Sequence, residues 1–364
     1  MGFDCGIVGL PNVGKSTLFN ALTNAGAASA NYPFCTIDPN KGIVTVPDER
    51  LELIQKYVES DRLVPTTIEL VDIAGLVKGA SKGEGLGNQF LGNIKNVAAI
   101  AHVVRCFDDP DVVHVNGNID PVRDIEIIHT ELILSDLDAV TKRIERNQKL
   151  VKGKDKTAEA QNVILERVKA ELDASRLVCH MGLTAEEQEL IKDLFLITVK
   201  PYFYVCNVDE SAMVTDTEPF LKVKAFAEKS GVPAIKICGK IEAEIAELDA
   251  AEKKEFLKDY GLKISGLELM ARTGYDLLSL ITYFTAGKQE IRAWTIKRGT
   301  LAPQAAGVIH SDFEKGFIKA EVYHFEDLVK CGSLAKVKES GLYRLEGKEY
   351  LVRDGDIMLF KFNV

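Results

Sequence analysis

Gly9-Leu10-Pro11-Asn12-Val13-Gly14-Lys15-Ser16 is the stretch of the sequence that decides the fold. It matches the pattern G-x-x-x-x-G-K-[ST], in which glycines allow backbone N–H groups to wrap around a phosphate. A short strand-like run, Cys5–Val8, precedes the stretch, and a helical pattern that begins at Thr17 follows it. The motif requires this strand–loop–helix context. We therefore predict a loop that binds the phosphates of a nucleotide.

Each residue type in this loop suits one part of a nucleotide. Lys15 is expected to neutralise the oxygens of the β- and γ-phosphates, and the Ser16 hydroxyl is expected to bind Mg²⁺. A glycine turn with an incidental lysine is the alternative interpretation, which the flanking strand and helix disfavour. The predicted nucleotide-binding residues of this part of the chain are Asn12, Val13, Gly14, Lys15, Ser16 and Thr17.

A second motif, D-x-x-G, ends an apolar strand pattern at Asp72. Asp72 is expected to hold Mg²⁺ through water, and the Gly75 N–H is expected to contact the γ-phosphate. Thr36, in the stretch Asn31–Thr36, is the candidate threonine that closes on Mg²⁺ and the γ-phosphate, with Thr45 as a weaker candidate. The sequence thus predicts a metal site made by Ser16, Thr36 and Asp72.

The stretch Asn207-Val208-Asp209-Glu210 indicates which base is bound. A guanine-binding nucleotidase has N-K-x-D here, and its aspartate accepts hydrogen bonds from guanine N1–H and the 2-amino group. Val208 replaces the lysine, and Glu210 places a longer carboxylate at the aspartate position. Adenine lacks both guanine donors, whereas an asparagine side chain can pair with adenine N6 and N7. We predict that Asn207, Val208 and Glu210 bind the base and that ATP is preferred over GTP. The alternative is a true GTPase in which Glu210 still reaches guanine.

The residue after Gly75 is Leu76, where Ras-like enzymes have the glutamine that orients the attacking water. An aliphatic side chain cannot orient water, so intrinsic hydrolysis is expected to be slow. His114 is a candidate for the missing group, although a solvated surface histidine is the alternative. The predicted catalytic residues are His114, Lys15 and Gly75.

Strand-like runs alternate with helical patterns, which is typical of a mostly parallel sheet covered on both faces. Over 126–199 apolar residues repeat at helical spacing on both sides of a charged stretch at 152–156, which predicts an inserted helical hairpin. The predicted strands of the α/β domain are Cys5–Val8, Ile43–Val46, Thr67–Asp72, Val103–Cys106, Tyr202–Cys206 and Ala234–Cys238.

From residue 278 onward short strands punctuated by glycines predict a small α+β domain. Its predicted strands are Ile291–Ile296, Phe317–Val322, Tyr350–Val352 and Met358–Phe362. The predicted domains are therefore a nucleotide-binding α/β domain over 1–125 and 200–277, a helical insertion over 126–199 and a C-terminal domain over 278–364.

Composition excludes several classes of protein. The net charge of −9 argues against a protein that coats nucleic acid through bulk positive charge. The longest nearly apolar run, Val97–Val104, is far shorter than the roughly 18 residues of a membrane helix, and the first residues do not resemble a secretion signal, so a cytoplasmic protein is expected. Seven scattered cysteines without a C-x-x-C pair predict reduced thiols and no zinc site. Cys35, next to Thr36, is a hypothetical redox switch.

Four motifs together resemble the YchF subfamily of Obg-like ATPases: G-L-P-N-V-G-K-S, N-Y-P-F-C-T, D-I-A-G-L-V-K-G-A-S-K-G-E-G-L-G-N-Q-F and N-V-D-E. The resemblance covers the whole chain. The helical insertion matches the coiled-coil arm of that family, and residues 283–287 and 302–307 resemble its TGS domain, a small ubiquitin-like fold. The resemblance implies a Mg²⁺-dependent protein that hydrolyses ATP in preference to GTP and binds ribosomes. His114 corresponds to the proposed catalytic histidine of the family, and Asn12 resembles an asparagine linked to K⁺ binding in related nucleotidases.

The partner surfaces are less well defined by the sequence. Lysines and arginines interleave with Trp294, Phe313, Phe317 and Tyr323 in the C-terminal part, which suits ribosomal RNA, although aromatic residues of a core are an equal alternative. The charged tip of the helical hairpin suits a further protein partner. An RNA-binding regulator that uses nucleotide only as an allosteric ligand is therefore a third hypothesis, and a metabolic kinase is disfavoured because no acceptor pocket or lid is recognisable.

Overall fold

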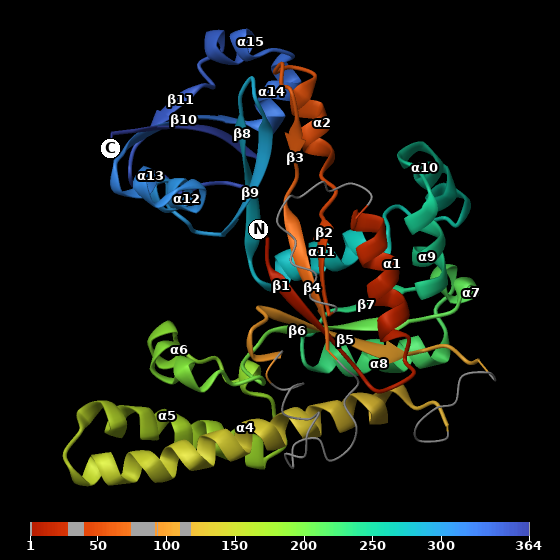
Figure 1. The fold of residues 1–364 in the computed structure, drawn as a ribbon, viewed down its shortest axis with the longest axis vertical. Coiled ribbons are helices and arrows are strands. Elements are labelled where there is room, and N and C mark those ends of the chain that lie inside the picture. The colour runs from red at the N-terminus through yellow and green to blue at the C-terminus, as the bar shows by residue number, and fades with distance from the viewer. Residues whose placement is uncertain (1, 28–39, 74–91, 93, 110–117, 364) are drawn as a thin grey trace. The chain divides into compact units, whose positions relative to one another are not determined.

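The computed structural model describes residues 2–27, 40–73, 92, 94–109 and 118–363 (Figure 1). Cys35, Thr36, Gly75 and His114 lie outside the described residues, so their roles stay predictions. Packing divides the chain into two compact units. We call residues Asp4–Gly42 and Leu70–Met270 the P-loop unit, and Met1–Phe3, Ile43–Glu69 and Ala271–Val364 the C-terminal unit.

The P-loop unit is built around a six-stranded sheet with the strand order β2-β4-β1-β5-β6-β7. The pairs β1/β5, β5/β6 and β6/β7 are parallel, and every residue of β5 and β6 is buried, as expected when helices cover both faces. The predicted mostly parallel α/β fold is therefore confirmed. The strands are β1 (Asp4–Val8), β2 (Lys41–Thr45), β4 (Thr67–Asp72), β5 (Ala99–Arg105), β6 (Tyr202–Asn207) and β7 (Ala234–Ile237).

Helices cover this sheet on two sides. Figure 1 shows α1 (Lys15–Ala27) and α9 (Gly239–Glu247) on one face, and α8 (Glu218–Lys229) with the first part of α4 on the other. Because parallel strands share one carboxyl edge, the loops after β1 and β6 emerge on the same side as the start of α1. The remaining helices near the sheet are α7 (Glu210–Val214), α10 (Ala250–Asp259) and α11 (Gly266–Leu277).

The predicted helical hairpin is confirmed as α4 (Pro121–Lys152) and α5 (Lys156–Asp173), which run side by side in Figure 1. Asp120 and Asp155 cap the two helices by accepting hydrogen bonds from backbone N–H groups of the first turns. Buried residues of the two helices face each other at helical spacing: Ile133, Val140 and Ile144 on α4, and Ile164, Val168 and Leu172 on α5. No helix of the described residues combines the length and the apolar character that crossing a bilayer requires.

The chain returns from the hairpin through η2 (Val178–His180), α6 (Ala185–Ile191) and η3 (Lys192–Leu194). A capping box between Thr184 and Glu187 opens α6. The buried carboxylate of Asp136 on α4 then accepts hydrogen bonds from the backbone N–H groups of Ile197 (3.0 Å) and Thr198 (2.7 Å). These bonds fix the base of the hairpin to the segment that enters β6.

The C-terminal unit contains a second six-stranded sheet, in the order β11-β10-β12-β8-β9-β3. Its strands are β3 (Leu63–Val64), β8 (Leu280–Ala286), β9 (Ile291–Lys297), β10 (Phe317–His324), β11 (Arg344–Glu346) and β12 (Asp356–Phe362). The predicted strand Tyr350–Val352 is wrong, because only Leu351 makes an isolated bridge there, with Leu301. The helices of the unit are α2 (Glu49–Gln55), α12 (Ala302–Ile309), α13 (Ser311–Lys315), α14 (Phe325–Cys331) and α15 (Leu334–Glu339).

Helix α2 and strand β3 come from residues 46–66, which we call the connector because they join β2 to β4. The connector packs in the C-terminal unit, although the sequence placed it within the stretch 1–125 of the nucleotide-binding domain. The two compact units are defined only by how the chain packs. The domain boundaries predicted from the sequence therefore stay a prediction.

Candidate nucleotide-binding site

The loop between β1 and α1 is shaped by close backbone approaches. A Cβ at Gly9 would lie 2.5 Å from the carbonyl oxygen of Val103, and a Cβ at Gly14 would lie 2.2 Å from Nδ2 of Asn207. Gly14 also has φ +90°, a left-handed conformation that favours glycine, and Asn12 has φ 63°. Both glycines of the motif are thus required by the close packing of the loop against Val103 and Asn207. The backbone is therefore already bent into the arrangement that the motif predicted.

Lys15 lies at the start of α1 and is 6% exposed. Its ammonium folds back over the loop and donates a hydrogen bond of 2.8 Å to the carbonyl oxygen of Leu10. Burial lowers the pKa of Lys15 to about 8, although the negative charge of Asp72 acts in the opposite direction. An anionic phosphate would favour the charged ammonium, so this environment suits a phosphate ligand.

Ser16 and Asp72 lie together at the predicted metal site. The Ser16 Oγ donates to Asp72 Oδ2 at 3.3 Å, and the Asp72 N–H donates to the carbonyl oxygen of Asn40 at 2.8 Å. Asp72 Oδ1 is buried and has no hydrogen-bond partner among the described residues. The Ser16 hydroxyl and the Asp72 carboxylate, with its Oδ1 not engaged by any described residue, form a donor set that suits Mg²⁺ and its water ligands. These residues therefore fit the predicted metal.

Asn207 connects three parts of the site. Its Nδ2 donates to the carbonyl oxygen of Val13 at 3.0 Å, and its Oδ1 accepts from the N–H of Gly239 at 3.2 Å. From the sequence, Asn207 was assigned to the base only, and this structural role was missed. The available signal was Gly14, because only a residue without a side chain leaves room for the Asn207 amide. A side-chain amide has two N–H donors and two acceptor positions on its oxygen. Asn207 is 6% exposed, and these two bonds leave one donor and one acceptor position of its amide unused.

The other predicted site residues differ in exposure. Val208 is 3% exposed, and its N–H donates to the carbonyl oxygen of Ile237, so its side chain belongs to the core. Val13 is buried as well, whereas Asn12 and Thr17 are exposed. Glu210 is exposed at the first residue of α7, three residues after Asn207. Asp209 is exposed as well, so N-V-D-E presents two carboxylates to solvent, of which Glu210 stands at the position of the guanine-binding aspartate.

Arg105, which was not predicted from the sequence, is a second residue that shapes the carboxyl edge of the sheet. It is the last residue of β5, pairs in register with Asn207 and is 1% exposed. Its guanidinium donates to the carbonyl oxygens of Phe107 and Asp109, both at 3.2 Å, and lies 4.6 Å from the centre of the Phe107 ring. A charged residue at the end of an apolar run was the signal available in the sequence. Arg105 fixes the direction in which the chain leaves β5.

The aromatic residues of the C-terminal unit are part of its cores. Phe317 is buried in the same cluster against which Trp294 and Phe313 pack, and Tyr323 is buried in a second cluster. The nearby lysines, such as Lys319 and Lys338, are exposed. Basic and aromatic side chains still meet at two places, where Arg292 lies 4.3 Å from the centre of the partly buried Trp294 ring and Lys338 lies 4.8 Å from that of Tyr343.

Among the described residues no disulfide joins cysteines and no group of three or more His, Cys, Asp or Glu side chains is arranged to hold a metal. Burial raises the pKa of the Cys5 thiol to about 12 and that of Cys179 to about 11. Both thiols are therefore poor nucleophiles at neutral pH.

Comparisons with known proteins agree with this geometry. A family model described as a 50S ribosome-binding GTPase matches residues 4–134, and the model named YchF-GTPase_C, described as a protein of unknown function, matches residues 280–363. Proteins named "Ribosome-binding ATPase YchF" from Haemophilus influenzae and from Bacillus subtilis are each 54% identical to this chain, and each alignment covers 100% of both chains.

A solved structure gives the same result in three dimensions. The structure described as the Schizosaccharomyces pombe YchF GTPase is 39% identical, matches with a TM-score of 0.88 and covers 99% of this chain and 98% of its own. Identity and fold agree over essentially the full length, including the helical hairpin and the C-terminal unit. The chain therefore belongs to the YchF family.

Proposed function

We propose that the protein is a Mg²⁺-dependent switch that binds and hydrolyses ATP in preference to GTP and binds ribosomes. The observation that carries the proposal is the phosphate loop, with Lys15 buried beside a Ser16–Asp72 pair in which Asp72 Oδ1 has no hydrogen-bond partner among the described residues. The names of relatives support it but differ in the nucleotide: the curated bacterial proteins are called ATPases and the fission-yeast structure is called a GTPase.

The phosphates would be bound by groups that the fold already aims at one point. Backbone N–H groups of the loop and of the first turn of α1 attract anionic oxygen, since the N-terminus of a helix carries partial positive charge. Lys15 exchanges its bond to Leu10 for a phosphate oxygen and supplies a full positive charge. Ser16 and Asp72 would hold Mg²⁺, which neutralises the charge that develops on the β- and γ-phosphates. Binding and charge neutralisation are therefore assigned to these residues.

Hydrolysis also requires an oriented water, and this chain lacks the usual glutamine because Leu76 occupies that position. Intrinsic turnover is therefore expected to be slow. His114 is the proposed group that orients the water, and the Gly75 N–H is the proposed contact of the γ-phosphate. In addition, Asn12 is the proposed K⁺-linked residue.

The preference for ATP is assigned to Asn207 and Glu210. Asn207 keeps one donor and one acceptor position, which match adenine N7 and the adenine 6-amino group. Glu210 stands where a guanine-binding protein has a shorter aspartate. Adenine lacks the N1–H and 2-amino donors that such a carboxylate binds, so the Glu210 carboxylate adds no hydrogen bond to adenine. Because Val208 is buried, no long side chain from that position covers the base. The main alternative is a GTPase in which Glu210 reaches guanine.

Ribosome binding is assigned to the C-terminal unit, proposed to be a TGS domain, and to the α4–α5 hairpin. Exposed lysines of the C-terminal unit supply local positive charge on a chain whose net charge is −9. The hairpin offers a long solvated surface to ribosomal RNA or to a protein partner. As a consequence of the switch, the nucleotide state should change the affinity for ribosomes.

Co-sedimentation with purified 70S ribosomes tests the proposal, with no nucleotide, with ADP and with a non-hydrolysable ATP analogue. We expect binding to differ between the ADP and ATP-analogue states. Equal binding in all three states would favour the alternative of an RNA-binding regulator, and absence of binding would refute the assigned partner.

A further inference from the structure

The connector (residues 46–66) links two strands of the P-loop unit's sheet, but it folds as part of the C-terminal sheet. Its strand β3 pairs with β9 in parallel, with Leu63 opposite Ile291. Its helix α2 buries Leu51 and Ile54 in the same cluster as Phe284 of β8. The boundaries between the two units fall within β2 and within β4. Each of these two strands therefore joins the connector directly to the nucleotide-binding sheet.

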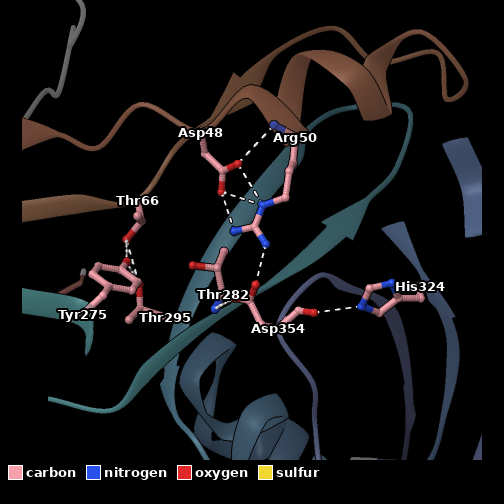
Figure 2. Close-up of polar contacts among 8 residues, drawn as sticks. All are labelled: Asp48, Arg50, Thr66, Tyr275, Thr282, Thr295, His324 and Asp354. Atoms are coloured by element: carbon pink, nitrogen blue, oxygen red, sulfur yellow. Dashed lines mark hydrogen bonds and ion pairs between the residues drawn. The ribbon is translucent and has the colours of Figure 1, made fainter. Parts of the chain in front are cut away.

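The first anchor of the connector is Arg50 on α2. Its guanidinium binds the Asp48 carboxylate through Nε and Nη2 and donates from Nη1 to Asp354 Oδ2 at 2.7 Å (Figure 2). It also lies 4.9 Å from the centre of the Phe284 ring. Asp354 Oδ1 in turn accepts from the N–H of Thr282 on β8 at 2.8 Å. Since this arrangement uses both sides of the guanidinium fork, it has one defined geometry.

The second anchor is Thr66, the last residue of the connector. Its hydroxyl lies 2.8 Å from the hydroxyl of Thr295 on β9, which in turn lies 2.6 Å from the hydroxyl of Tyr275 (Figure 2). The Thr66 carbonyl oxygen accepts from the N–H of Val46, the first residue of the connector, at 2.9 Å. Both ends of the connector are therefore held together at the C-terminal sheet.

Strand β4 starts directly after Thr66 and ends at Asp72. Six residues of extended chain span about 20 Å, and a hydrogen-bonded strand changes its length little. At the far end, the Asp72 N–H donates to the carbonyl oxygen of Asn40, the residue before β2, and Asp72 Oδ1 has no hydrogen-bond partner in the part of the chain that the structure describes. The residue assigned to Mg²⁺ thus lies on a strand whose beginning is fixed by the C-terminal sheet.

We propose that Arg50 and Asp354 are positioning residues for the metal site, acting through the connector and β4 on Asp72. The C-terminal unit thereby regulates Mg²⁺-nucleotide binding, and Mg²⁺-nucleotide binding stabilises the anchored connector to the same extent, because coupling between two sites is reciprocal. The inference rests on the proposed function for the Mg²⁺ role of Asp72, but it does not depend on which base is bound.

The test measures how much Mg²⁺ strengthens ATP binding in the full-length protein, as the ratio of the Kd in EDTA to the Kd in excess Mg²⁺. Arg50→Ala and Asp354→Asn should leave the Kd in EDTA unchanged and lower the ratio by about fivefold, the lower end of typical coupling. The double variant should lower it no further than either single variant, since both remove one contact.

Arg62→Ala is the matched control. It removes an ion pair between the connector and Glu290, but the Arg62 side chain is 69% exposed and that pair lies at the surface. The ratio should stay at the wild-type value. If Arg62→Ala lowers the ratio as much as Arg50→Ala does, or if neither anchor variant lowers it, the proposal is wrong. Should Arg50→Ala fail to fold, Asp354→Asn keeps an acceptor for the Thr282 N–H and is judged by the same ratio.

Hydrogen exchange of the wild-type protein gives an independent readout. Mg²⁺-ATP, compared with ATP in EDTA, should slow exchange in peptides from 46–66 and in the loop around Lys15. Slowing confined to the loop would contradict the coupling. If the protein prefers GTP, the ATP assignment fails while the same measurements with GTP still decide the coupling, so the two failures are distinguishable.

Discussion

The phosphate loop and the C-terminal sheet are built in opposite ways. The loop is held within its own unit: Lys15 bonds to Leu10, five residues away, and Gly9 and Gly14 allow close approaches to Val103 and Asn207 on neighbouring strands. The C-terminal sheet is assembled from distant segments, and the ion pair beside its edge strand β3 joins Arg62 to Glu290, 228 residues apart. The difference teaches that the phosphate loop is shaped by contacts within the P-loop unit, whereas the connector before β4 is held by packing in the C-terminal unit.

The largest expected effect tests the long-range side of this comparison. Phe284 on β8 is fully buried in the cluster that also contains Leu51 and Ile54 of α2. Phe284→Ala should therefore destabilise the C-terminal unit by about 3–5 kcal/mol. Hydrogen exchange of peptides from 280–297 measures this loss. ATP affinity in EDTA should stay at the wild-type value, because the contacts that shape the loop lie within the P-loop unit. A parallel loss of that affinity would break the comparison.

Removing the charge from the loop tests its local side. Lys15→Ala should weaken ATP binding about a hundredfold, since a charge-assisted bond to phosphate contributes about 3 kcal/mol. Calorimetry on nucleotide-free protein measures the Kd, and Lys229→Ala, an exposed lysine on α8, is the matched control. Tight ATP binding by the Lys15 variant would contradict the assignment of the site.

Asn207→Ala sharpens the comparison, because Asn207 is the side chain that ties the loop to β6 and α9. The change leaves the Val13 carbonyl and the Gly239 N–H without their partner, which costs about 2 kcal/mol. ATP affinity should fall about thirtyfold, while thermal unfolding of the C-terminal unit stays unchanged. Glu210→Gln, which keeps the size of an exposed side chain, should leave ATP affinity at the wild-type value.

The smallest effect is a pH dependence. Because burial lowers the pKa of free Lys15 to about 8, the ammonium that binds phosphate is nearly fully present about one pH unit below 8 and is progressively lost as the pH rises through 8. ATP binding should therefore take up a proton above pH 8, and affinity should fall by about tenfold per pH unit there. Calorimetry in two buffers of different ionisation enthalpy measures the uptake. Constant affinity up to pH 9.5 would contradict the lowered pKa.

What the sequence could predict follows the same division. The phosphate loop, the Ser16–Asp72 pair and the helical hairpin were predictable because their signals lie within single motifs or periodic runs. Strand β3 has two residues and is defined only by its pairing with β9, so no local sequence pattern predicts it. The wrong strand at Tyr350–Val352 also depends on pairing, since Leu351 makes a single bridge to Leu301 there instead of a ladder.

The site itself was predicted unevenly. The sequence placed Asn207 at the base but not its bonds to Val13 and Gly239, because those bonds depend on how three strand ends meet. Arg105 was missed for the same reason. Its guanidinium is held by carbonyl oxygens of the chain that leaves β5, and a backbone carbonyl carries no residue-specific signal.

The central claim, an ATP-selective site at Asn207 to Glu210, is tested most directly by calorimetry with nucleotide-free protein and Mg²⁺. The dissociation constants of ATP and GTP are measured side by side for the wild type and for Glu210→Asp. The account predicts tighter binding of ATP by the wild type and a gain in GTP affinity in the variant. Equal affinities, or tighter binding of GTP by the wild type, would contradict it.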